Sequence, residues 1–252
     1  MVPGPDRFRA HFEGLEDSYA LIGGAACSLI FDEAGLDFRA TKDIDMVLCV
    51  EVVDGKFATA LKAFLDAGGY AARQRSEGRR EFHRFQNPKD GSYPAMLELF
   101  SNRVGIHEIE DGDELATVPV ADDVLGLSAI LLDPDCHAAL VASRRAIDGV
   151  HVLDESLLIP FKARAFVDLY RRREAGDQAV RRDDIKKHRN DVFRLIQLLR
   201  ADQKVAVAEP LKTDLRDYME AVGTIGSFDP SRFGVQLEPS EGFELLADVY
   251  AL

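Results

Sequence analysis

The feature that most constrains the fold is an apolar run that ends in two glycines and is followed by a second apolar run that opens with two carboxylates. The first run reads SYALIGG at 18–24, and the second reads DIDMVLCV at 43–50. Short apolar runs of this kind are typical of buried strands, and the AACSLIFDEAGL segment between them has the composition of a helix that Gly35 closes. The pattern predicts a strand, a Gly-Gly turn, a helix and a second strand.

The flanking segments extend this pattern into an α+β domain. RFRAHFEGLED (7–17) has helical spacing, and GKFATALKAFLDAGG (55–69) is an amphipathic helix that ends in two glycines. Three later segments look extended, at 70–75, 80–85 and 95–100. Helices interleaved with strands, followed by a run of strands, predict a mixed sheet covered by helices, over residues 1–150.

Beyond residue 150 the sequence is mostly helical. ESLLIPFKARAFVDLYRRRE (155–174) and DDIKKHRNDVFRLIQLLR (183–200) each have a polar start and a basic end, which suits the helix dipole. A further helix is predicted at 210–222, with a short one near the C-terminus. The prediction is therefore a second, helical domain over residues 151–252.

Charge and cysteine content limit the function classes. The net charge of −13 argues against a general nucleic-acid coat protein, because phosphate binding depends on clustered Lys and Arg. Residues 151–200 nevertheless carry twelve Lys/Arg against eight Asp/Glu, so a local basic surface stays open. The three cysteines show no C-x-x-C spacing, which argues against a zinc knuckle or a disulfide framework. With no apolar run near the roughly 18 residues of a membrane span and no leader pattern, we expect a cytoplasmic protein without a membrane partner.

The two carboxylates, Asp43 and Asp45, are candidates for a metal site. Side chains at i and i+2 of a strand share one face, so the two would repel each other with nothing between them. A hard cation such as Mg²⁺ removes that conflict, since it takes carboxylate oxygens and completes its shell with water and substrate phosphates. The alternative is a strand start with one solvated and one capping Asp.

The glycine pair, Gly23 and Gly24, is a candidate for phosphate binding. Glycine lets a ligand approach the backbone closely, and the following helix offers free N–H groups and a positive dipole end. Taken alone, Gly-Gly is only a turn. Beside the Asp pair it supplies the phosphate half of a nucleoside triphosphate (NTP) site.

Together these residues resemble a known family. G-G-x-A-x-x-L followed by R-x-T-x-D-I-D is similar to the signature of the polymerase-β-type nucleotidyltransferase fold, and specifically of its AbiEii-like branch, known as toxins of toxin–antitoxin and phage-defence pairs. The residues that carry the resemblance are Gly23, Gly24, Ala26, Leu29, Arg39, Thr41, Asp43 and Asp45.

The resemblance implies further site residues. The family's third carboxylate lies on a later strand, where Glu98 in AMLELF is the match, as a Glu instead of an Asp. In the helical half, Lys162 matches a Lys-x-x-Ala helix and Asp191 an Arg-Asp-containing helix, whose polar side chains reach back to the nucleotide in that family. The alternatives are an edge-strand residue facing water for Glu98 and surface charges for Lys162 and Asp191.

The function that the resemblance implies is transfer of an NMP group from an NTP to an acceptor hydroxyl. Asp43, Asp45 and Glu98 would hold Mg²⁺, the glycine pair would cradle the β- and γ-phosphates, and Arg39, Thr41 and Lys162 would assist at the phosphates. RNA, a protein or a small molecule all fit as acceptor, and a cognate antitoxin is the implied partner. The alternative is a catalytically inactive binding or scaffold protein with the same fold.

One basic segment stays ambiguous. ARQRSEGRREFHRF (72–85) holds five arginines and two phenylalanines. This composition is compatible with contact to nucleic acid or to a triphosphate. It is equally compatible with an exposed hairpin.

Overall fold

The computed structural model describes residues 5–48, 55–74, 80–100, 139–226 and 228–252. The chain divides into two compact units, Met1–Asp154 and Glu155–Leu252. The sequence predicts a boundary after residue 150. This is four residues before the observed boundary and lies at the start of the last strand of the first unit.

The first unit is α+β, as predicted from the sequence. Its elements in chain order are α1 (Pro5–His11), the 3₁₀ turn η1 (Glu16–Ser18), β1 (Tyr19–Ile22), α2 (Gly23–Glu33), β2 (Asp43–Leu48), α3 (Gly55–Gly68), β3 (Ala71–Gln74), β4 (Arg80–Gln86), β5 (Met96–Phe100), β6 (Arg144–Ile147) and β7 (Val150–Leu153). The expected strands and helices up to β5 are present, although α1 ends earlier than expected and the expected strand residues 49–50 lie outside the described ranges.

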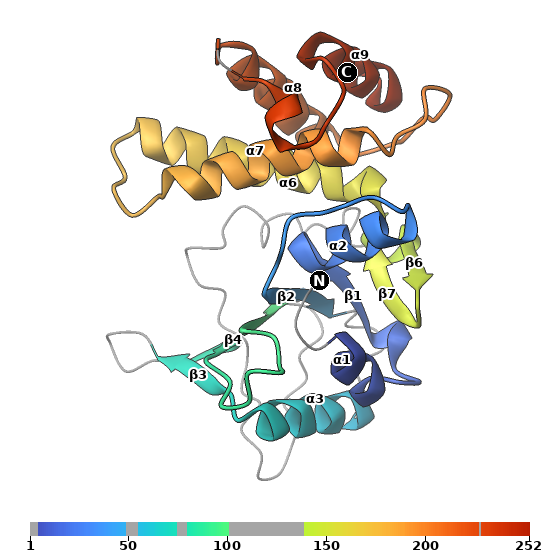
Figure 1. Ribbon diagram of the computed structural model, residues 1–252, viewed down its shortest axis with the longest axis vertical. Helices are drawn as coiled ribbons and strands as arrows, with labels where there is room; N and C mark the ends of the chain where they lie inside the picture. The colour runs from blue at the N-terminus through green and yellow to red at the C-terminus, as the bar shows by residue number, and fades with distance from the viewer. Residues whose placement is uncertain (1–4, 49–54, 75–79, 101–138, 227) are drawn as a thin grey trace. The chain divides into compact units, whose positions relative to one another are not determined.

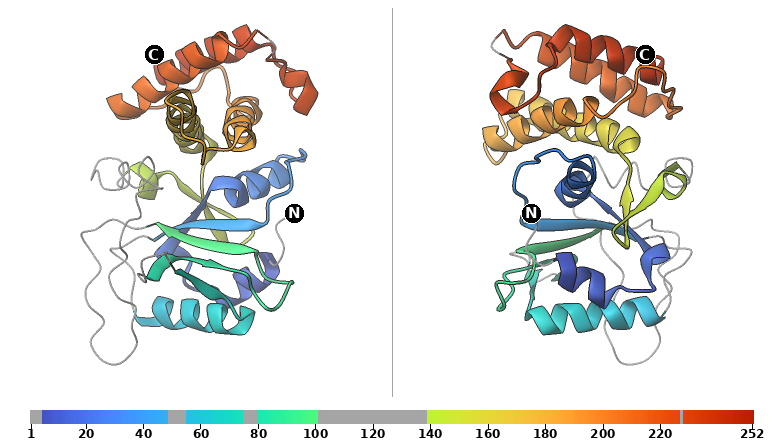
Figure 2. Two further views of the ribbon diagram at one scale, coloured as in Figure 1. Left: turned by 90° about the vertical axis from the view of Figure 1, so that its left-hand side faces the viewer. Right: turned by 45° about the vertical axis from the view of Figure 1, so that its right-hand side comes forward.

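The described strands form one mixed sheet in the order β3-β4-β5-β2-β1-β7-β6. β2 runs parallel to β5 and β1 runs parallel to β7, and the other neighbouring pairs are antiparallel. α2 lies on one face of the sheet, and α1 and α3 lie on the other (Figures 1 and 2).

The face toward α1 and α3 is an aromatic core. Phe8 of α1 and Phe12, directly after the end of α1, pack on Tyr19 of β1 and on Phe64 of α3, with ring centroids 5.4–5.7 Å apart. All four side chains are at most 1% exposed. Strand side chains alternate between the two faces of a sheet. A strand residue an odd number of positions from Tyr19, or one paired with such a residue on the neighbouring strand, therefore points toward α2.

The β6–β7 hairpin is an element that the sequence reading missed. Its two-residue turn is Asp148-Gly149, and both residues have positive φ, +49° and +74°. Asp-Gly between apolar residues is the strongest short-range hairpin signal, because this turn type needs left-handed backbone at both positions. The signal is present in RRAIDGVHVL, and β7 then adds to the sheet beside β1, with Leu21 opposite Val152.

The second unit is helical, as expected for this half of the chain. Its elements are α6 (Glu155–Glu174), α7 (Arg182–Ile196), α8 (Glu209–Gly223), the 3₁₀ turn η3 (Pro230–Phe233) and α9 (Pro239–Tyr250). α6 contains Pro160, which has no N–H to donate to the Ser156 carbonyl one turn earlier. The Tyr250 hydroxyl of α9 donates to that carbonyl instead, at 2.7 Å. None of the helices in the described part of the chain is long and apolar enough to cross a membrane.

Candidate functional site

Three carboxylates lie on the α2 face of the sheet. Ile22 of β1 pairs with Asp45 of β2, and Asp45 pairs in turn with Glu98 of β5. Asp43 is two residues before Asp45 and therefore shares its face. The structure thus brings the three predicted metal ligands to one face of two adjacent parallel strands, with Glu98 buried and the two aspartates partly exposed.

The Gly-Gly turn lies directly against one of these carboxylates, that of Asp45. Gly23 has a φ of +64°, and a Cβ at this position would lie 2.0 Å from Asp45 Oδ2. A Cβ at Gly24 would lie 2.7 Å from Thr41 Oγ1 and 3.7 Å from a terminal guanidinium nitrogen of Arg39. Glycine is therefore required at both positions, because any side chain would displace a predicted site residue.

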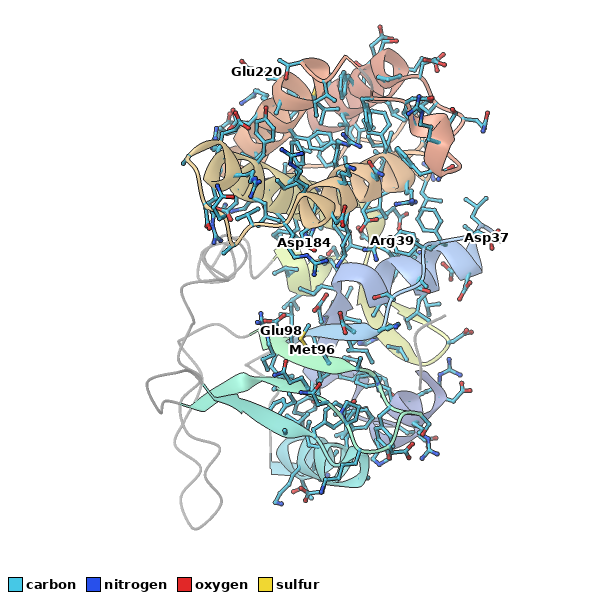
Figure 3. All side chains as sticks on the ribbon, turned by 60° about the vertical axis from the view of Figure 1, so that its left-hand side comes forward. Asp37, Arg39, Met96, Glu98, Asp184 and Glu220 are labelled. Carbon is cyan, nitrogen blue, oxygen red and sulfur yellow. The ribbon has the colours of Figure 1, made fainter. Side chains whose placement is uncertain are left out.

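The start of α2 completes this side of the site. The eleven-residue helix begins at Gly23, and Ile22 before it makes no side-chain capping hydrogen bond. The first-turn N–H groups of a helix have no intrahelical acceptor, and the helix dipole makes this end favourable for an anion. Figure 3 shows Arg39 on the segment that leads from α2 to β2, and Glu98 on β5.

The electrostatics of Glu98 reflect its neighbours. Burial raises the pKa of Glu98, and the negative charges of Asp45 and then of Asp43 raise this pKa further. The Arg84 guanidinium acts in the opposite direction and lowers the pKa. The negative charges of Asp45 and Asp43 therefore disfavour ionised Glu98, and a positive charge on this face favours it.

Arg84 of β4 is a site residue that the sequence reading did not single out. It lies opposite Glu98 in the β4–β5 register, and its Nε and Nη2 both donate to Glu98 Oε1, at 2.9 and 2.5 Å. Arg84 belongs to the basic segment 72–85, so one of its arginines points into the carboxylate site. The signal that could have found it is the alternation in REFHRF, but choosing among five arginines required the pairing of β4 with β5.

The carboxylate oxygens of Asp43, Asp45 and Glu98 are of the type that binds a divalent cation such as Mg²⁺, but their positions fit such an ion only partly. Carboxylate oxygens are the ligands that such an ion prefers, and here they come from two adjacent strands. Among the described residues, however, no three His, Cys, Asp or Glu side chains are grouped so that they could hold a metal ion. One oxygen of Glu98 is engaged by Arg84.

Lys162 and Asp191 lie in the second unit, where the structure brings them to each other. Lys162 Nζ donates to Asp191 Oδ2 at 3.1 Å, and Arg194 donates to Asp191 Oδ1 at 3.1 Å. Lys162 is 5% exposed and Asp191 is fully buried. The alternative that both are surface charges is therefore wrong, and their role toward a nucleotide stays a prediction.

Comparison with known proteins adds no relative. No family model, no curated protein and no solved structure matches this chain. The resemblance to AbiEii-like nucleotidyltransferases therefore stays a prediction from the motif residues.

Gly23→Ala tests whether the turn positions Asp45. We expect the variant to lose metal-dependent nucleotide binding, because the added Cβ forces the Asp45 carboxylate away from the start of α2. Gly35→Ala is the matched control, since Gly35 has a similar φ of +70° and a Cβ there would meet no described atom within 4 Å. Both variants carry the backbone strain of about 1–2 kcal/mol for a left-handed Ala. Equal binding by the two variants, measured by calorimetry, would contradict this role for Gly23.

Proposed function

We propose that this protein is a divalent-metal-dependent nucleotidyltransferase that transfers an NMP group from an NTP to an acceptor hydroxyl. The observation that supports the proposal is the convergence of two halves of a triphosphate site on one sheet face. The Gly23-Gly24 turn at the start of α2 is packed against Asp45 and Thr41, and the carboxylate of Glu98 lies on the neighbouring strand.

Each half has a distinct role in the proposal. The start of α2 holds the β- and γ-phosphates through backbone N–H groups, and Arg39 and Thr41 lie close enough to Gly24 to contact the same phosphates. Asp43 and Asp45 would hold Mg²⁺, which when bound offsets phosphate charge and lowers the pKa of the attacking hydroxyl. This placement directs the α-phosphate, and not the γ-phosphate, toward the carboxylates.

The reaction that follows is a displacement at the α-phosphorus. The acceptor oxygen forms a bond to this phosphorus, and the bond between the phosphorus and the oxygen bridging to the β-phosphate breaks. Pyrophosphate leaves with that electron pair, and the hydroxyl proton passes to water. The chain contributes orientation and charge compensation, which provide most of the catalysis in phosphoryl transfer.

A second candidate is a nucleotide-binding module without catalysis. Two observations favour it: the Arg84–Glu98 ion pair engages the third carboxylate, and the described residues offer no three-ligand metal group. Folds of this kind can persist as binding proteins after catalysis is lost. The two candidates differ in whether the NMP group of the NTP is transferred to an acceptor.

Transfer from NTPs labelled at either the α- or the γ-phosphate tests the proposal. The protein is incubated with Mg²⁺ and separate RNA, protein and small-molecule fractions, and label retained by each acceptor fraction is counted. We expect retention of the α-label only, because the γ-phosphate leaves with pyrophosphate. Retention of the γ-label alone would indicate a kinase and would contradict the proposal.

The control for this experiment is the same mixture with a metal chelator, in which transfer should stop. Tight NTP binding with no transfer to any of the three fractions would favour the binding module. Comparing all four NTPs in parallel identifies which nucleotide is used.

A further inference from the structure

The contact between Arg84 and Glu98 has an unusual form for an ion pair. Arginine and carboxylate often pair side by side, with each N–H directed to a different oxygen. Here Nε and Nη2 of Arg84 both donate to Oε1 of Glu98. In the described part of the chain, the structure gives Oε2 no hydrogen-bond donor. One oxygen of Glu98 is therefore held by Arg84, while the other stays available to a ligand.

The charges on this face explain why an arginine is held there. Asp43, Asp45 and Glu98 share the face, and Glu98 lies 6% exposed, directly opposite Asp45. A buried carboxylate beside two others needs a cation to offset its charge. Arg84, whose side chain is 19% exposed, provides that positive charge within hydrogen-bonding distance of Glu98.

A divalent cation bound by Asp43 and Asp45 would compete with Arg84. The ion would carry positive charge into the same cluster, where the guanidinium would repel it and occupies an oxygen that the ion could use. We propose that Arg84 takes the place of the metal at Glu98 and is a positioning residue that lowers the affinity of the site for metal alone. The inference rests on the proposed function in one respect, since it takes Asp43 and Asp45 as metal ligands.

The consequence is that metal and nucleotide bind together. The anion best able to draw Arg84 from Glu98 is a triphosphate bound at the start of α2, because arginine binds phosphate as it binds carboxylate. The start of α2 lies against Asp45, which pairs with Glu98 on the next strand. With nucleotide present, Glu98 is released to the metal. Without nucleotide, Arg84 keeps the metal site weak.

Arg84→Gln tests the inference through binding of Mn²⁺ alone, measured by calorimetry and by the electron paramagnetic resonance signal of free Mn²⁺. We expect the variant to bind Mn²⁺ about tenfold more tightly than the wild type, because it removes one positive charge close to the ion. A merely structural role would predict the opposite, since a distorted site loses affinity. Arg84→Lys keeps the charge and should bind Mn²⁺ nearly as the wild type does.

Arg145→Gln is the matched control, because Arg145 pairs with Glu33 in the same unit on a more exposed surface. It should leave Mn²⁺ affinity unchanged. Unchanged or weaker Mn²⁺ binding by Arg84→Gln would overturn the inference while leaving transfer of the α-label, and so the proposed function, intact. If Arg84→Gln folds only with Mn²⁺, as seen by circular dichroism, the inference is supported; failure to fold at saturating Mn²⁺ overturns it.

Discussion

Replacing Asp43 and Asp45 together with asparagine is expected to abolish Mg²⁺-dependent NTP binding while leaving the fold at least as stable as before. Mutating a residue that only hydrogen-bonds to a metal ligand typically lowers metal affinity about 10- to 100-fold. Loss of two direct ligands should therefore lower metal affinity by more than about 100-fold. Stability should not fall, because the charges of both aspartates raise the pKa of Glu98 and so oppose its ionised form in the folded protein. Removing a like charge directly opposite on a sheet relieves about 0.2–1 kcal/mol.

Nucleotide binding is measured by calorimetry with each NTP and Mg²⁺, and stability by thermal unfolding without metal. The control replaces two exposed aspartates of the same unit, Asp32 and Asp66, with asparagine. This change removes the same net charge and should preserve binding. A marked fall in melting temperature for the Asp43 and Asp45 variant would show that the pair is structural, as caps or ion-pair members, and the metal assignment would be withdrawn.

The central part of this site could be predicted from local sequence. The period of two in a strand places Asp43 and Asp45 on one face, and a Gly-Gly pair at a strand end predicts a turn that admits a close neighbour. Both rules depend only on residues within a few positions. That Gly23 meets Asp45 depends on the antiparallel pairing of β1 with β2, which these local rules do not predict and which the register shows.

Arg84 could not be predicted in the same way. Its partner Glu98 is fourteen residues away, and the contact depends on β4 and β5 pairing in one register out of several. A shift of one residue would turn Arg84 to the opposite face. The β6–β7 hairpin differs, since the Asp148-Gly149 turn is a local signal that was present and overlooked.

The second unit shows a further limit of sequence reasoning. A lone charge in IPFKARAF indicates that Lys162 needs a partner, but the sequence does not say which one. The structure pairs it with Asp191 of α7, twenty-nine residues along the chain, and adds Arg194 to the same carboxylate. Packing between two helices decides this contact, and helix periodicity alone does not fix how α6 and α7 face each other.

Asp191→Ala is accordingly expected to destabilise the second unit strongly. Asp191 is fully buried and accepts hydrogen bonds from both Lys162 and Arg194, so its removal takes a negative charge away from two cations at once. Breaking a buried pair by removing one partner costs about 3–5 kcal/mol, because the remaining charge stays buried without compensation. This is a large part of the typical total stability of about 5–15 kcal/mol.

Chemical unfolding of the full chain, followed by far-UV circular dichroism, measures this loss, since the second unit is helical and the chain has no tryptophan. Asp217→Ala is the control, because Asp217 pairs with Arg171, whose side chain is 65% exposed, and such pairs contribute about 0–1 kcal/mol. Lys162→Met combined with Asp191→Leu should be less destabilising than Asp191→Ala, since it leaves no buried lysine without its carboxylate. If Asp191→Ala unfolds like the wild type but loses nucleotide transfer, Asp191 is retained for catalysis and its burial is incidental to folding.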